Sequence, residues 1–241
     1  MKTRLLALIA LVAAQVSLSS CGKTETTGGT KPEPVPEKNV SLSLSSGIAS
    51  KTVLGDMNGD VYPVYWCEGD RIIVNGKRSA PLHGIGDKDV KATFDVGGVN
   101  APYGVVYPSW ICDAMDSEAA EVSLQAVQKW TPGSFSSGAA VLYGKSSETE
   151  FELKNLCGVV RIAMDFGKNK ISGIVLTSLT TPISGKFSLN LSSGELSAID
   201  GKNRIEISVP DAGFATGSPE TAELNFCVPA GEYPDGFNIT V

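Results

Sequence analysis

Short runs in which apolar and polar residues alternate dominate the chain after Asn39. A period of two places successive side chains on opposite faces, so each run is typical of a β-strand with one face on a core and the other in water. Runs of this kind occupy residues 150–154, 160–164, 187–191, 204–209, 224–228 and 237–241. The pattern predicts an all-β fold.

Turn-forming residues separate these runs and predict tight connections between the strands. The pairs are Asn58-Gly59, Asn75-Gly76, Gly97-Gly98, Ser193-Gly194, Asp200-Gly201 and Asp235-Gly236. Residues 117–128 are the one stretch that fits a helix, and Val122, Leu124 and Ala126 within it fit a strand equally well. Many short antiparallel strands with frequent turns predict a sandwich or a barrel.

A change of pattern near residue 166 predicts two domains. A turn at Phe166–Asn169 precedes a new set of strand-like runs that starts at Ile171. We therefore expect an N-terminal β-sandwich domain over residues 40–166 and a partial C-terminal one over residues 167–241. The sequence stops in mid-alternation at Val241, so we expect the second domain to be incomplete at its C-terminal end.

The first 20 residues have the layout of a lipoprotein signal peptide. Lys2 and Arg4 precede the apolar stretch Leu5–Val16, which is too short to span a bilayer. Leu18-Ser19-Ser20-Cys21 then has the pattern of a lipobox, which predicts cleavage between Ser20 and Cys21 and acylation of Cys21. The alternative is an ordinary signal peptide with a cysteine near its cleavage site by chance. We expect a lipid-anchored protein of the outer membrane.

Residues 21–39 predict a flexible tether, because they are almost free of apolar side chains and rich in proline and glycine. The alternative is an ordered arm that packs on the folded part. Without the first 20 residues, the chain carries 18 basic and 26 acidic residues. This acidic balance argues against a nucleic-acid partner.

Four cysteines follow Cys21, at positions 67, 112, 157 and 227. They are widely spaced and contain no C-x-x-C pair, so the sequence does not support a zinc site. An exported chain permits disulfides, and the spacing assigns no pairing. We expect mostly buried free thiols.

His83 is the only histidine, so a Ser-His-Asp hydrolase or a zinc hydrolase of this sequence would depend on it. Neither a G-x-S-x-G nor an H-E-x-x-H motif is present, and Gly84-Ile85-Gly86 lacks the third glycine of a dinucleotide loop. We interpret His83 as a turn residue.

Two acidic segments have a chemical and a structural interpretation. Asp56–Asp60 resembles the start of a calcium loop, but Val61 and Cys67 stand where such a loop needs glycine and glutamate, which favours a hairpin turn. Glu68 and Asp70 would lie about 7 Å apart on a strand, as a glycosidase pair could. A turn around Gly69 is the simpler interpretation.

The remaining candidates also favour structural roles. Asp113, Asp116, Glu118 and Glu121 are interpreted as a solvated acidic stretch. Trp66, Trp110 and Trp130 are of a type that stacks on sugars, but tryptophan in β-sandwiches more often belongs to the core or its edge. We therefore predict no catalytic residue, metal or cofactor, and a structural or binding protein rather than an enzyme.

Four stretches together resemble the fimbrillin family, the lipoprotein precursors of type V pili. The order and spacing of the stretches carry the resemblance. They are Ser50–Val53 followed by Val64–Ile72, then Phe151–Ile162, then Ile171–Thr177 with Ile183–Phe187, and finally Val228–Val241.

The resemblance implies two consecutive transthyretin-like, Greek-key β-sandwich domains displayed at the cell surface. It also implies that a trypsin-like protease cuts between Lys51 and Thr52, where the family usually has arginine, and that Val40–Ser50 is lost as a strand. A strand from another pilin subunit would then fill the groove in donor-strand exchange. Family members continue past the position of Val241.

The expected function is therefore that of a structural subunit of cell-surface fimbriae that supports adhesion to a host or bacterial surface ligand. The alternative is a surface-anchored lipoprotein of another class that binds a glycan or a host ligand through exposed loops and tryptophans.

Overall fold

β-Strands form nearly all the regular structure in the residues that the computed structural model describes, which are 38–46, 65–86, 88–165, 171, 173–209 and 221–241. Within these ranges there is no α-helix, and a single 3-10 turn, η1, spans Ser109–Ile111. None of the described segments is a helix long and apolar enough to cross a membrane. The predicted all-β class is confirmed.

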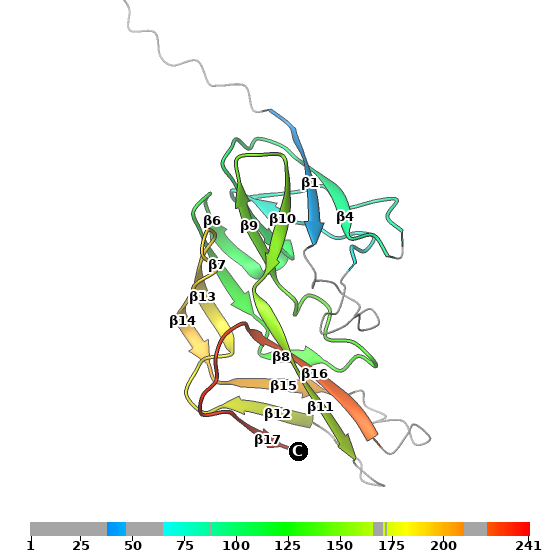
Figure 1. Ribbon diagram of the computed structural model, residues 1–241, viewed down its shortest axis with the longest axis vertical. Helices are drawn as coiled ribbons and strands as arrows, with labels where there is room; N and C mark the ends of the chain where they lie inside the picture. The colour runs from blue at the N-terminus through cyan, green and yellow to red at the C-terminus, as the bar shows by residue number, and fades with distance from the viewer. Residues whose placement is uncertain (1–37, 47–64, 87, 166–170, 172, 210–220) are drawn as a thin grey trace, which may run out of the picture. The chain divides into compact units, whose positions relative to one another are not determined.

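The described strands form four sheets (Figure 1). The largest has the order β3-β2-β5-β9-β10-β1-β4, and two four-stranded sheets have the orders β17-β12-β15-β8 and β14-β13-β7-β6. β11 and β16 pair with each other. The strands are β1 (Val40–Ser46), β2 (Ile73–Val74), β3 (Lys77–Arg78), β4 (Lys91–Val96), β5 (Tyr103–Tyr107), β6 (Cys112–Met115), β7 (Ala119–Leu124), β8 (Val127–Lys129), β9 (Leu142–Ser146), β10 (Glu150–Asn155), β11 (Cys157–Asp165), β12 (Gly173–Ser178), β13 (Ser184–Asn190), β14 (Leu196–Lys202), β15 (Arg204–Ser208), β16 (Thr221–Pro229) and β17 (Phe237–Thr240).

Every predicted alternating run lies on a strand. The six runs lie on β10, β11, β13, β15, β16 and β17, within one or two residues at their ends. The ambiguous stretch 117–128 contains β7 and the start of β8, so its strand interpretation is correct. Ala120, Val122 and Leu124 of β7 are buried, which is the period-two pattern of a strand.

One predicted turn is wrong. Asn75-Gly76 does connect β2 to β3, with positive φ angles of 46° and 81° that suit a two-residue hairpin. Asp200-Gly201, however, lies inside β14, where a register shift against β13 lets the strand continue. A Cβ at Gly201 would lie 2.6 Å from the Pro182 Cβ, so the glycine permits close packing rather than a turn.

Two of the core clusters are built from different strands. The first joins Leu42 and Leu44 of β1 to Trp66, Phe94 and Leu153. The second contains buried residues from β12, β15 and β16, with half-buried residues of β11 and β17 against it. The sheet β17-β12-β15-β8 and the pair β11-β16 therefore share one core.

Strands from both sides of residue 166 pair with one another. β7 pairs with β13, β8 with β15 and β11 with β16. Backbone contacts also group Glu37–Val241 as one unit. The division into domains at residue 166 stays a prediction.

Candidate functional site

The first described strand, β1, lies inside the seven-stranded sheet, between β4 and β10 (Figure 1). It runs antiparallel to β4, with Leu42 opposite Phe94, and parallel to β10, with Leu44 opposite Phe151. The Ser43 N–H donates to the Thr149 carbonyl at 2.8 Å, so β1 is hydrogen-bonded to the β10 side at that position. The strand whose loss the fimbrillin resemblance predicts is thus an interior strand.

The inner face of β1 completes the first core cluster. Leu42 and Leu44 are fully buried. Phe94 and Leu153 on the neighbouring strands have at most 1% of their surface exposed. Burying a leucine side chain stabilises a fold by about 1.5–3 kcal/mol. Ser46 follows on the same face, and its hydroxyl donates to the Val90 carbonyl at 3.0 Å.

The outer face of β1 carries three serines in two different environments. The Ser41 hydroxyl donates to Asp95 Oδ1 at 2.6 Å, and Ser41 is exposed. Ser43 and Ser45 point the same way, since they are two and four residues further along the strand, but both are half-buried. Above them, Lys91 of β4 forms an ion pair with Glu150 of β10.

Several predicted functional residues lie outside the described ranges. They are the lipidation site Cys21, the signal cleavage site Ser20 and Cys21, the processing site Lys51 and Thr52, and the calcium-like segment Asp56–Asp60. The structure describes the removable strand from Val40 to Ser46, and Gly47–Ser50 fall outside it. The lipidation, cleavage and processing sites therefore stay predictions.

The carboxylates of Glu68 and Asp70 form hydrogen bonds with different partners. Glu68 lies in a turn, and its Oε1 is 2.7 Å from His83 Nδ1 while its Oε2 accepts the Gly84 N–H at 3.0 Å. The His83 contact, with smaller contributions from backbone N–H groups, lowers the pKa of Glu68. Asp70 accepts the Cys67 N–H at 2.8 Å and the Tyr107 hydroxyl at 2.9 Å. The contacts of Glu68 and of Asp70 fit the interpretation of this segment as a turn. His83 is exposed in a loop.

The three tryptophans divide into two packed residues and one exposed residue. Trp66 is buried edge-on against Phe94 and Tyr107, with ring centroids 5.0 and 5.1 Å away. Trp130 packs on the second core, and its Nε1 donates to the Glu223 carbonyl at 3.1 Å. Trp110 is 54% exposed, so only this tryptophan offers much of its surface to a ligand.

The four cysteines in the described residues are free thiols. Cys112 and Cys227 are buried, and Cys67 and Cys157 are half-buried. Desolvation raises the pKa of the Cys112 thiol to about 11 and that of Cys157 to about 12. This agrees with the expectation of mostly buried free thiols.

The acidic stretch around β6 and β7 forms ion pairs at the surface. Lys186 Nζ lies 3.0 Å from Glu121 Oε2 and 3.2 Å from Asp113 Oδ2, and these two carboxylates raise the pKa of Lys186. Glu118 binds Lys145 Nζ with both oxygens at 2.5 Å. These carboxylates connect neighbouring strands and loops in addition to being solvated.

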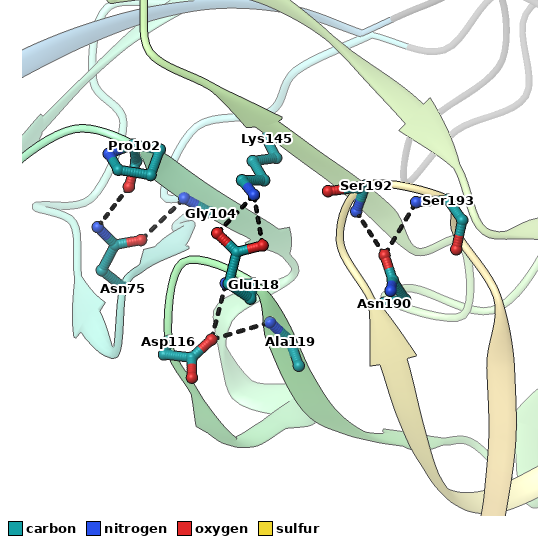
Figure 2. Close-up of polar contacts among 10 residues, drawn as sticks. All are labelled: Asn75, Pro102, Gly104, Asp116, Glu118, Ala119, Lys145, Asn190, Ser192 and Ser193. Atoms are coloured by element: carbon teal, nitrogen blue, oxygen red, sulfur yellow. Dashed lines mark hydrogen bonds and ion pairs between the residues drawn. The ribbon is translucent and has the colours of Figure 1, made fainter.

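A pocket of about 380 Å³ lies between the β9–β10 hairpin and the loops around residues 102 and 192. Figure 2 shows how the loops near it are held: Asn190 Oδ1 accepts the Ser192 and Ser193 N–H groups, and Asn75 binds Gly104 and Pro102. The residues that line the pocket include Pro102, Lys145, Ser147, Glu152, Lys154 and Ser192. Sequence reasoning missed this pocket, because its residues come from separate segments and share no local motif.

Among the described residues, no group of three or more histidine, cysteine, aspartate or glutamate side chains is arranged to hold a metal ion. Comparisons of the chain with protein-family models, with curated proteins and with solved structures found no match.

Proposed function

We propose that this chain is a structural subunit of cell-surface fimbriae of the type V kind, built from two consecutive transthyretin-like β-sandwich domains. It is exported as a lipoprotein, anchored in the outer membrane through Cys21 and cut between Lys51 and Thr52. Another subunit then supplies the strand that replaces β1, and the resulting fibre supports adhesion.

The position of β1 is the observation that carries this proposal. β1 lies between β4 and β10 and buries Leu42 and Leu44 completely. The chain continues from β1 towards Lys51, only five residues after Ser46. After a cut at that point, β1 would be held in the sheet by non-covalent contacts alone.

Loss of β1 would leave a site that favours a new strand. The edges of β4 and β10 would present unpaired N–H and carbonyl groups, which pair readily with another chain. The apolar side chains of Phe94 and Leu153 would lose their cover. An inserted strand restores both sets of contacts, with main-chain hydrogen bonds supplying affinity and alternating side chains setting the register.

The N-terminus of the mature protein tests the proposal. We would purify the protein from outer membranes of the producing cell and determine its first residue by mass spectrometry. A lipid-free chain that begins at Thr52, together with heat-resistant ladders on denaturing gels, is the expected result. The variant Lys51→Ala should abolish both, and Lys38→Ala, which removes another basic residue upstream, should abolish neither. A chain that begins only at acylated Cys21 would overturn strand removal.

Two observations favour the second candidate function, a surface-anchored protein that binds a glycan. Trp110 is 54% exposed, and the pocket beside the β9–β10 hairpin carries the hydroxyl, ammonium and carboxylate groups that bind sugar hydroxyls. A saccharide array probed with the uncleaved protein distinguishes the two functions. Binding that Trp110→Ala or Glu152→Gln abolishes would favour this candidate, and ladders that depend on Lys51 would favour the fimbrial subunit.

A further inference from the structure

We propose that the place of β1 between β4 and β10 favours strands with small side chains on the outer face. The Lys91–Glu150 ion pair, which we call the filter, sets this preference. Large side chains at the positions of Ser43 and Ser45 are disfavoured, whichever chain provides the strand, because they displace the exposed Lys91–Glu150 ion pair. The part of this inference that concerns a partner subunit rests on the proposed function. The part that concerns β1 itself does not.

The ion pair has to cross the outer face of β1. Lys91 belongs to β4 and Glu150 to β10, and β1 lies between these strands. Strands two places apart in a sheet are about 9.6 Å apart, so the two side chains meet only by extending towards each other over the strand between them. Lys91 lies opposite Ser45 and Glu150 opposite Ser43, so the crossing lies over these two serines.

The burial of the three outer serines agrees with this cover. Ser41, Ser43 and Ser45 share one face of one strand, and the residue type is the same at all three positions. Ser41 is exposed, whereas Ser43 and Ser45 are half-buried. A phenylalanine at either covered position would occupy the space through which the lysine and glutamate side chains reach each other.

The inner face adds a second requirement. Leu42 and Leu44 fill fully buried positions, and the buried Ser46 donates both its N–H and its hydroxyl to the Val90 carbonyl. A strand that replaces β1 must therefore be apolar at the first two inner positions, small at the third, and small at the two covered outer positions. The partner is an extended segment of another subunit with the pattern apolar–small–apolar–small–small.

The first test uses the intact chain, so it does not depend on processing. We would measure thermal unfolding of Ser45→Phe and of the matched control Ser41→Phe, each alone and combined with Lys91→Ala and Glu150→Ala. Ser45→Phe should lower the melting temperature clearly more than Ser41→Phe does. The double alanine change should remove most of that difference, because interacting sites are not additive. Equal effects of the two phenylalanines, or no rescue, would overturn the filter.

The second test concerns the partner strand. The full chain would be cut after Lys51 and mixed with labelled synthetic peptides that cover residues 38–46. The unchanged peptide and its Ser41→Phe form should exchange into the protein, and the Ser45→Phe form should bind more weakly, by up to about fivefold, as expected for the loss of an exposed ion pair. Equal binding of all three peptides would overturn the filter. Failure of the unchanged peptide to bind would instead contradict strand exchange, and the intact-chain test would still judge the filter.

Discussion

Gln128 of β8 binds the backbone of Cys227 of β16 as a neighbouring strand would. Its Nε2 donates to the Cys227 carbonyl at 2.7 Å, and its Oε1 accepts the Cys227 N–H at 2.9 Å. Two further contacts link the same segments: Trp130 Nε1 donates to the Glu223 carbonyl, and Asn225 Nδ2 donates to the Ser134 carbonyl. Side chains thus satisfy part of the β16 backbone, and Gln128 itself is buried, with 2% of its surface exposed.

Replacing Gln128 by leucine should destabilise the protein by about 2–4 kcal/mol. The change leaves the buried N–H and carbonyl of Cys227 without partners, and each such group costs about 1–3 kcal/mol. Urea denaturation measures the change in the free energy of unfolding. The control Gln125→Ala removes one exposed hydrogen bond, to the Ser137 carbonyl, and one half-buried bond from the Ser136 hydroxyl, and should cost about 1 kcal/mol. Equal losses in the two variants would contradict the role of Gln128.

Leu44→Ala should lower the free energy of unfolding by about 2–5 kcal/mol, because it opens a cavity in a fully buried position. Val40→Ala on the same strand is the matched control, since Val40 is only half-buried, and should cost about 1 kcal/mol. Chemical denaturation of the full chain checks both values. A change of less than 1 kcal/mol for Leu44→Ala would mean that β1 contributes little to the first core.

Local patterns predicted most of the strands, but not their neighbours. The runs that form β10, β11, β13, β15, β16 and β17 are visible because apolar and polar residues alternate in the sequence, although β16 is buried on both faces and Ile239 of β17 is exposed. The placement of β1 between β4 and β10 depends on pairings over more than 40 and 100 residues, which no local period encodes. The contact between Gln128 and Cys227 spans 99 residues for the same reason.

The candidate site was predictable only in part. Val40, Leu42 and Leu44 have the alternation of a strand with one buried face, and β1 has that form. The cover over Ser43 and Ser45 was not predictable, since it arises from two charged residues, Lys91 and Glu150, on strands distant in sequence. The turn predicted at Asp200-Gly201 is wrong because a glycine needed for close packing against Pro182 looks the same in sequence as a turn glycine.

Gly138→Ala should displace the exposed Trp110 ring. A Cβ at this position would lie 2.2 Å from Trp110 Cζ2, which is too close for any real contact. The matched control is Gly133→Ala, because Gly133 has a similar positive φ of 65° against 71° for Gly138 but open space around it. Both variants carry the backbone strain of about 1–3 kcal/mol, and only Gly138→Ala should shift tryptophan fluorescence. A shift of equal size in both would contradict the contact.

His83→Ala should raise the pKa of Glu68 towards its ordinary value of 4.5, because the His83 contact is the main reason that this pKa is lowered. A carboxyl whose pKa is lower in the folded than in the unfolded protein stabilises the fold above pH 4.5 and loses that contribution as pH falls through the folded pKa. An NMR titration of the Glu68 carboxyl measures the midpoint directly. A midpoint at or above 4.5 in the unchanged protein would contradict the contact, as would a midpoint that His83→Ala leaves unchanged.

Alkylation rates should separate the cysteines of the folded protein. Burial raises the pKa of the Cys112 thiol to about 11 and that of the Cys157 thiol to about 12, so at pH 8 only about one Cys112 in a thousand is the reactive thiolate. We expect iodoacetamide to modify Cys67 well before Cys112 and Cys157, as followed by peptide mass spectrometry. In denaturant all three should react at similar rates, because the burial that raises the pKa values is gone. Fast modification of Cys157 in the folded protein would contradict its desolvation. A mass lower by two hydrogens with no alkylation would instead identify a disulfide.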